Sequence, residues 1–286
     1  MKSVWLAALM LAFSPLMATA SGPGAVRKQV ESSMLVTGEI EIDARGRVSN
    51  LLIDQQDKLP GGIPEFVKGQ LVQWKFEPVL RDGRPTPARS RMSVRLVGKL
   101  IDDDSATITI RSADFPGPVP GEGESVTHIS MQPPRFPAPA ARSGAQGTAY
   151  LVLKVSRDGT VADAIVEQVN LRVVGSESEM TRLREMFSKA SLTAARRWTF
   201  KPPTRGAAAG EEFWSVRVPV DYLLGTTSVL TRYGKWQAHI PGPRQTIPWS
   251  QENEAAGFSP DALAEGGVYM ANAESGLRLL TPLGGG

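Results

Sequence analysis

Few side chains in this 286-residue chain could carry covalent or metal chemistry. Cysteine is absent, which excludes disulfides, thiolate metal sites, a cysteine nucleophile and a lipid-modified N-terminal cysteine. The two histidines, His128 and His239, lie in or beside Pro- and Gly-rich surroundings, so we predict that each is a surface-loop residue. The sequence has no Gly-x-Ser-x-Gly elbow and no phosphate-binding Gly-Lys-Ser/Thr loop. We therefore expect no enzyme activity, no cofactor and no metal site.

Charged side chains do not point to a cation or to nucleic acid. Asp102, Asp103 and Asp104 are consecutive acids, but they lack the alternate spacing and the glycine of a calcium loop, so we predict a solvated turn. Lys and Arg number 32 against 29 Asp and Glu, and no basic block stands out. Phosphate binding needs clustered basic residues, so no nucleic-acid partner is expected.

The first twenty residues predict a targeting segment. Lys2 gives a positive start, Val4 to Phe13 is apolar, and Ala18-Thr19-Ala20 fits a small-x-small cleavage site. The apolar stretch is short for a membrane span, which needs about 20 residues. We therefore predict a signal peptide over residues 1–20 and a location in the periplasm. The alternative is a retained N-terminal anchor in the inner membrane, with periplasmic domains.

A first unit of strands around one helix is predicted between residues 34 and 98. Met34 to Asp43 alternates apolar and polar residues, and Val48 to Ile53 would be the return strand after a glycine turn. Pro64 suits the first turn of a helix. The helix is followed by Trp74-Lys75-Phe76-Glu77-Pro78 and by a last alternating strand, Met92 to Val97.

A second unit repeats this order. Its opening segment is Gln132–Pro137, its first strand is Gly147–Val155 and its glycine turn is Asp158-Gly159. The Trp-x-Phe-x-Pro motif follows at Trp198–Pro202, and the last strand is Trp214–Val220. Ser176, with Glu179 three residues later, is a capping-box pattern that predicts the start of its helix. The apolar face of this helix would comprise Met180, Leu183, Met186, Phe187, Ala190, Ala194 and Trp198. The shared order predicts an internal repeat.

Three features of the second unit occur together in one known family: the Pro-aromatic-Pro opening, the glycine-turn hairpin, and the Trp-x-Phe-x-Pro motif before an alternating strand. The stretch from Gln132 to Leu224 resembles the C-terminal domain of TonB, the periplasmic arm that carries energy to outer-membrane receptors. The first unit lacks the Pro-aromatic-Pro opening and resembles a weaker second copy. The resemblance implies, by analogy, the outer-membrane transport of iron complexes or similar nutrients.

These patterns predict an α+β fold with two TonB C-terminal-like domains, each a small antiparallel sheet of about three strands with one main helix. We expect a first domain at 34–112, a Pro- and Gly-rich linker at 113–130, a second domain at 131–225 and a tail at 226–286. Proline cannot join a central ladder, so the tail is either an extended strap over the domains or partly disordered.

The resemblance also implies where a partner binds. In this family the last strand of the domain takes up a short receptor segment by strand pairing, and the matching strand here runs from Trp214 to Tyr222. Pro219 lacks an N–H, so it would interrupt the ladder on one side. The strand residues expected to face the core are Val216, Val218 and Val220.

The expected partner-binding residues come from the opening segment and from this last strand. They are Gln132, Pro133, Phe136, Pro137, Trp214, Ser215, Arg217 and Asp221. Of these, Ser215, Arg217 and Asp221 would face away from the core. The alternative for Phe136 is that it packs on its own domain.

We therefore predict a periplasmic TonB-like protein that binds an extended peptide or a partner protein by edge-strand addition, in an outer-membrane transport context. Its partner would be an outer-membrane TonB-dependent receptor or a second copy of this chain, with membrane contact only through a retained N-terminus. One alternative is a membrane-anchored energy transducer, although no long Pro-rich arm lies between Ala20 and Met34. The other is a structural, dimeric periplasmic scaffold whose strand edges are consumed internally.

Overall fold

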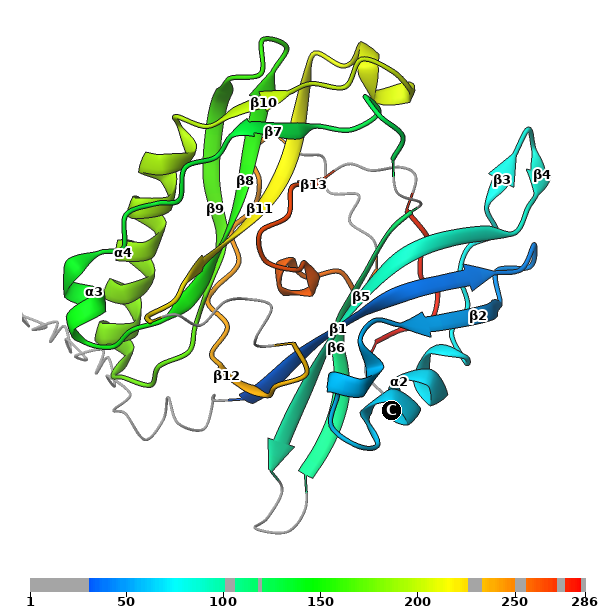
Figure 1. Cartoon of the computed structure of the whole chain (residues 1–286), viewed down its shortest axis with the longest axis horizontal. Coiled ribbons are helices and arrows are strands. Elements are labelled where there is room, and N and C mark those ends of the chain that lie inside the picture. The colour runs from blue at the N-terminus through cyan, green and yellow to red at the C-terminus, as the bar shows by residue number, and fades with distance from the viewer. Residues whose placement is uncertain are drawn as a thin grey trace, which may run out of the picture.

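The structure, a computed structural model, describes residues 31–100, 106–117, 120–225, 233–249, 256–271 and 276–283. The predicted signal peptide and the predicted turn at Asp102–Asp104 lie outside these residues. Within the described ranges, no helix combines the length and the apolar character needed to cross a membrane. The fold mixes α and β structure, and two main antiparallel sheets lie side by side, each with one main helix (Figure 1).

The first sheet is built around β1 (Glu31–Ile42). One side of β1 pairs with β5 (Ala88–Leu100), and β6 (Ala106–Gly117) extends the sheet beyond β5. The other side of β1 pairs with β2 (Val48–Ile53) at one end and with β12 (Gln237–His239) at the other. β12 therefore brings the C-terminal tail into the first sheet.

One face of this sheet packs on α2 (Ile63–Leu71). Pro64 lies in the first turn of α2, as predicted, where its missing N–H costs no helical hydrogen bond. The buried core includes Val36, Ile40, Ile42, Val67, Leu71, Trp74, Phe76, Val94, Leu96 and Phe115. The connections of this unit hold η1 (Gln56–Lys58), β3 (Leu80–Arg81) and β4 (Arg84–Pro85).

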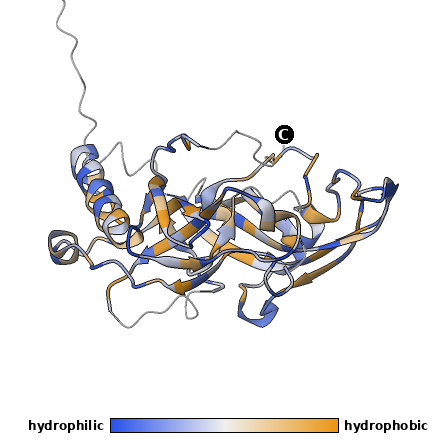
Figure 2. Cartoon of the chain, turned by 90° about the horizontal axis from the view of Figure 1, so that it is seen from above, coloured by the Kyte–Doolittle hydropathy of each residue, from blue (hydrophilic) through white to orange (hydrophobic). Residues whose placement is uncertain are grey.

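The second sheet is built around β8 (Gly147–Ser156), with β9 (Val161–Leu171) on one side and β11 (Phe213–Tyr222) on the other. A short tail strand, β13 (Tyr269–Met270), pairs with the outer edge of β11. α4 (Glu177–Ala195) covers one face of this sheet. Figure 2 shows the apolar residues gathered on the strands and on the inner side of this helix.

The smaller elements of the second unit flank the sheet. β7 and β10 pair with each other, and α3 and η2 lie in connections. Their bounds are Thr127–Ser130 for β7, Ala138–Arg142 for α3, Thr199–Lys201 for β10 and Ala207–Gly210 for η2.

The predicted capping box starts α4. The Ser176 backbone N–H donates to Glu179 Oε2 at 2.7 Å, and the Glu179 backbone N–H donates to Ser176 Oγ at 3.4 Å. These bonds satisfy two backbone donors that the first helical turn leaves without a partner. This prediction is confirmed.

The same turn geometry recurs in both sheets. Gly46 and Gly159 have φ values of 73° and 81°, and the carbonyl of each accepts the backbone N–H of Phe76 or Phe200 at 2.8 Å. A Cβ on Gly46 would lie 1.9 Å from the Phe76 carbonyl oxygen, and one on Gly159 would lie 2.0 Å from that of Phe200. Glycine is therefore required at both turns, because φ is positive and because a Cβ would collide with a carbonyl oxygen.

The described parts of the tail form a strap between and beside the sheets. β12 joins β1, β13 joins β11, and the short helix η4 (Pro260–Ala262) is buried against β5 and β6. Leu277 and Leu279 enter the first core, whereas Ile240 enters the second. The strap alternative thus holds for these residues.

Two expectations about the architecture differ from the structure. Each sheet has more than three strands, because β6, β12 and β13 add to the predicted ones. The linker expected at 113–130 is also shorter: residues 113–117 end β6, and residues 127–130 form β7. Phe115 explains the shorter linker, since its ring packs edge-on against Trp74 at 6.1 Å and Phe76 at 5.0 Å and holds this Pro- and Gly-rich stretch on the core.

Candidate functional site

The outer edge of β11 is the surface that the sequence singled out. The Ala271 backbone N–H donates to the Ser215 carbonyl oxygen at 2.8 Å, so the backbone groups of Ser215 point outward, toward β13. Successive residues of a strand alternate, and the β11–β8 register is regular, so Arg217, Pro219 and Asp221 share this direction. The N–H that Pro219 lacks is therefore missing at the outer edge and not from the ladder with β8.

β13 covers part of this edge. Met270 lies opposite Val216, and Tyr269 lies opposite Arg217. With the Ala271 bond, the tail pairs with β11 over Ser215 to Arg217, whereas β8 pairs with it from Phe213 to Tyr222. The edge proposed for partner binding thus carries a short strand of the same chain.

The two faces of β11 match the predicted alternation. Val216, Val218 and Val220 are buried in the core beneath α4. Ser215 and Arg217 face away from that core, but they are only 3% and 5% exposed. The tail covers them, since Trp249 Nε1 donates to Ser215 Oγ at 3.0 Å and the Phe258 ring centroid lies 4.6 Å from Arg217 Cζ.

Arg217 belongs to a buried ion-pair group. Its Nε lies 2.9 Å from Glu167 Oε2, and Arg244 Nε from the tail donates to Glu167 Oε1 at 2.8 Å. Glu167 is fully buried. Removing one member would leave a buried charge without its partner, which is strongly destabilising. Arg217 therefore has a structural role between the second sheet and the tail.

Asp221 and Trp214 are also held by their own domain. Asp221 Oδ1 accepts Thr148 Oγ1 at 2.6 Å and Arg172 Nη2 at 3.0 Å. Trp214 is buried, and its Nε1 donates to the carbonyl oxygen of Ala208 at 2.8 Å. Both side chains are therefore engaged within the second unit. These residues could contribute to partner binding only as part of the β11 strand.

The opening segment packs on the second unit. The Phe136 ring makes edge-on contacts with Phe187 at 5.8 Å and with Tyr222 at 5.5 Å, so packing on its own domain is what the structure shows. The Gln132 carbonyl accepts Trp198 Nε1 at 2.8 Å. Pro133 is exposed, and Pro137 caps α3. Phe136 and Tyr222 bring this segment to the end of β11.

A buried polar cluster that the sequence did not predict anchors the tail to the first sheet. Asp261, in η4, accepts Arg95 Nε and Nη2 at its carbonyl oxygen at 2.8 and 2.6 Å, and accepts Ser112 Oγ at Oδ1 at 2.8 Å. His239 Nε2 lies 3.3 Å from Asp261 Oδ2. Burial would raise the pKa of Asp261, but His239, the Arg95 charge and the Ser112 hydroxyl outweigh it and hold this pKa below its usual range.

His239 is therefore not the surface-loop residue that we predicted. It belongs to β12 and is 5% exposed, and burial lowers its pKa although Asp261 opposes this. Its Pro- and Gly-rich neighbours gave no signal of burial, because the pairing of β12 with β1 is a long-range contact. His128, in contrast, is exposed in β7.

A small polar cavity of about 10 Å³ lies beside this cluster, where both sheets and the tail meet. The cavity is lined by residues of β1, β5, β8 and β9 and by tail residues. The lining residues include Arg95, Tyr150, Asn170, Arg172 and His239. Two buried nitrogens of its lining have no hydrogen-bond partner within the described residues: Asn170 Nδ2 and Arg172 Nη1. A cavity of this size has room for about one water-sized group.

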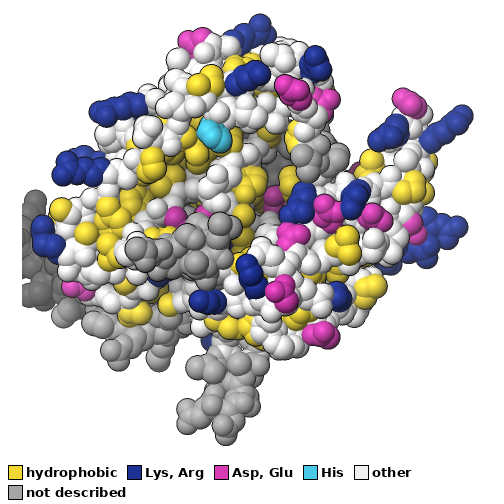
Figure 3. All heavy atoms as spheres, in the orientation of Figure 1, with side chains coloured by type: hydrophobic (Ala, Val, Ile, Leu, Met, Phe, Trp, Pro, Cys, Tyr) yellow, Lys and Arg dark blue, Asp and Glu magenta, His cyan; other side chains and the backbone are white. Residues whose placement is uncertain are grey.

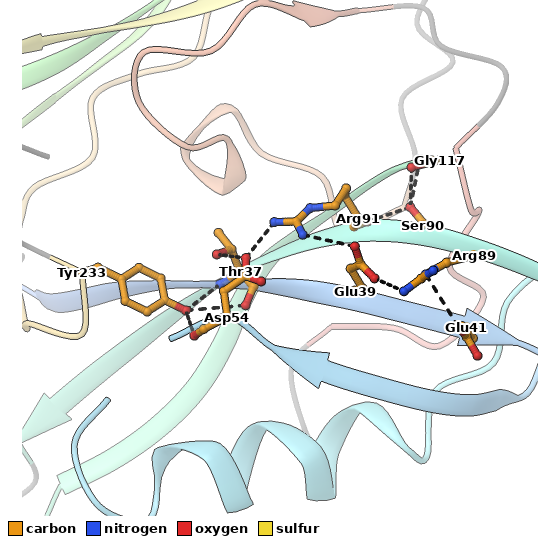
Figure 4. Close-up of polar contacts among 9 residues, drawn as sticks. All are labelled: Thr37, Glu39, Glu41, Asp54, Arg89, Ser90, Arg91, Gly117 and Tyr233. Atoms are coloured by element: carbon orange, nitrogen blue, oxygen red, sulfur yellow. Dashed lines mark hydrogen bonds and ion pairs between the residues drawn. The ribbon is translucent and has the colours of Figure 1, made fainter. Parts of the chain in front are cut away.

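A second tail contact lies on the polar face of the first sheet, opposite α2. Figure 4 shows Tyr233, whose hydroxyl donates to the Asp54 carbonyl at 2.7 Å, beside an ion-pair row in which Arg91 reaches Asp54 Oδ2 at 2.7 Å and Glu39 Oε1 at 3.4 Å. Arg89 continues the row with Glu39. On the face drawn in Figure 3, acidic and basic side chains are interspersed over this half of the molecule.

Comparisons with known proteins match the second unit. Residues 132–224 match the family described as Gram-negative bacterial TonB protein C-terminal. Over 106 residues the chain is 34% identical to "Protein TonB" from two strains of Xanthomonas campestris pv. campestris, which covers 36% of this chain and 40% of each relative. It is 33% identical over 91 residues to "Protein tonB2" of Pseudomonas aeruginosa, covering 32% of this chain and 28% of that protein. The matched part is thus well under half the length of these relatives.

Proposed function

We propose that this chain is a periplasmic TonB-like protein that binds an extended segment of a partner protein by strand addition to β11, in outer-membrane transport. The partner class is an outer-membrane TonB-dependent receptor. The observation that carries the proposal is the conjunction of a TonB-like unit at 132–224 with an outer edge of β11 that takes up a strand, since β13 already pairs there. Backbone pairing at a sheet edge supplies affinity with few side-chain requirements.

Pro219 supports this use of the edge. A strand that continued beyond Arg217 would meet an outward position without an N–H, which limits indiscriminate pairing. The side chains at the edge are engaged within the domain, so a partner would be recognised mainly through backbone groups.

We also propose that residues 31–117 are a diverged second copy of the same unit. Both units place a hairpin, a helix, a Trp-x-Phe segment and a last strand in the same order, and both make the same bond between turn glycine and Phe. In this first unit the last strand is β5, and β6 already pairs with it. Partner binding is therefore assigned to the second unit alone.

A structural scaffold is the competing function, and one observation favours it: the last strands β5 and β11 both carry additional strands of the same chain. On that account the edges are consumed internally and no partner strand is needed. Binding of a peptide at β11 distinguishes the two functions.

The experiment measures the affinity of the full chain for labelled synthetic peptides that match the short periplasm-facing segments of TonB-dependent receptors from the same genome. The informative variant is Pro219→Ala, which adds one outward N–H beyond the reach of β13. We expect about two- to tenfold tighter binding, the effect of one added hydrogen bond. Pro139→Ala, on the exposed surface of α3, is the matched control and should leave the affinity unchanged. The absence of binding to every peptide by both the parent chain and Pro219→Ala would overturn the proposal and favour the scaffold.

A further inference from the structure

The outer edges of the two units are covered to very different extents. β6 has 12 residues, and its pairing with β5 extends from Arg91 opposite Gly117 to Leu100 opposite Ala106. β13 has 2 residues and lies opposite Val216 and Arg217. Each backbone pair adds a small net stabilisation, so the longer strand is held far more firmly than the shorter one. The edge of β11 is the one that a competing strand could reach.

The short strand is positioned by an anchor on the other sheet. η4 ends seven residues before Tyr269, and its three residues are buried. Arg95 and Ser112 bind Asp261, and Ser93 Oγ donates to the Ala262 carbonyl at 2.6 Å. All three donors belong to β5 or β6, so the first sheet holds the tail at the place from which β13 reaches β11.

The connection between the anchor and β13 can bend. Gly266 has φ near 80°, a Cβ built there would meet nothing within 4 Å, and Gly267 follows it. Two consecutive glycines give the backbone a wide choice of conformations. Tyr269 could therefore leave β11 while Asp261 stays bound to β5 and β6, with loss of the Ala271 bond and of the Tyr269 hydroxyl bond to the Ala264 carbonyl.

We propose that Tyr269–Ala271 is a tethered cap on the partner-binding edge of β11, held in place by the first sheet and displaced by the extended segment of a partner. This inference rests on the function proposed above, and it adds a regulatory role for the first unit and the tail. The cap occupies the place of a partner strand, so the apparent affinity for the partner is reduced by the fraction of molecules that are capped.

The absence of cysteine makes a direct test possible, through the variant Val216→Cys/Met270→Cys. The pairs Ser215–Ala271 and Arg217–Tyr269 face each other with their backbone groups, so Val216 and Met270 form the intervening pair, in which side chains lie closer. That geometry suits a disulfide. The oxidised form holds the cap closed, and the reduced form leaves it free to open.

The measurement is the affinity of both forms for the same labelled receptor peptides. We expect the oxidised form to bind about tenfold or more weakly than the reduced form of the same variant. Thr127→Cys/Lys201→Cys, an exposed pair between β7 and β10, is the control in which oxidation should have no effect. Equal binding by the reduced and oxidised forms of the cap variant would overturn the inference while leaving the proposed function intact.

A second variant opens the cap. Ala271→Pro removes the N–H that reaches the Ser215 carbonyl, and we expect about three- to tenfold tighter peptide binding. Unchanged or weaker binding by a folded Ala271→Pro chain would also contradict the cap. If neither the parent chain, nor the reduced Val216→Cys/Met270→Cys variant, nor Ala271→Pro binds any peptide, the proposed function is contradicted. The proposed cap is then contradicted with it.

Discussion

Phe136 shows at the scale of one residue how a family-like motif can serve the fold. The Pro-aromatic-Pro pattern predicted that it lies near a partner, and the structure places its ring against Phe187 and Tyr222. Ser215 and Arg217 are similar: their alternation was predictable from the strand pattern, but their burial was not. The tail residues that cover them, Trp249 and Phe258, lie far along the chain and carry no local signal of that contact.

Phe136→Ala should therefore reduce stability more than it reduces affinity. The ring is half-buried in an aromatic cluster, so we expect a loss of about 2 kcal/mol in the free energy of unfolding. Urea denaturation followed by tryptophan fluorescence measures this loss. Peptide affinity of the folded variant should change less than twofold, and a large loss of affinity with unchanged stability would instead place Phe136 at the partner contact.

Asp114, on β6, predicts a pH dependence. Burial raises its pKa to about 6, although the nearby Arg217 charge opposes this. A carboxyl whose pKa is raised in the folded state contributes stability below its unfolded pKa, and this stability is lost as the pH rises through about 6. Asp114→Asn should thus match the parent near pH 4 and exceed its stability by about 1–3 kcal/mol at pH 8.

Thermal unfolding of both proteins across this pH range measures the difference. Asp57→Asn, at an exposed position in η1, is the control. A stability difference between Asp114→Asn and the parent that does not grow from pH 4 to pH 8 would show that Asp114 ionises in the folded protein as readily as in the unfolded chain.

At the scale of elements, the hairpins and main helices were predictable because their signals are local. Glycine turns, the capping box at Ser176 and the proline in α2 each act within a few residues. β12 and β13 were not predicted. A strand of two or three residues has no periodicity to detect, and its pairing depends on a partner more than 50 residues away.

The equivalence of the two turns can be tested by substitution. Gly46→Ala and Gly159→Ala combine a positive φ with a Cβ that meets a carbonyl oxygen, so each should cost about 2–5 kcal/mol. Gly83→Ala has a similar φ but open space, and it should cost only about 1 kcal/mol. Unfolding free energies from denaturant titration test this order. A cost at Gly46 no greater than at Gly83 would argue against a shared turn in the two units.

At the scale of the whole molecule, two sheets with helices on one face are joined by a tail that contributes to both (Figure 1). The tail meets the sheets at several polar groups, which are the Glu167 group, the Asp261 cluster and the cavity beside it. Sequence patterns predict which face of a strand is apolar, but they do not show what covers the polar face. The buried ionisable residues here were therefore beyond sequence-based prediction.

The central claim is that a partner strand replaces the tail at β11. Amide hydrogen exchange of the full chain, with and without a bound receptor peptide, tests it most directly at three amides. We predict that the Ala271 amide, which donates to Ser215 in the free chain, loses protection on binding, whereas the amides of Arg217 and Asp221 keep or gain it. If the peptide binds while Ala271 stays protected and β11 is unchanged, the partner binds elsewhere and the account is contradicted.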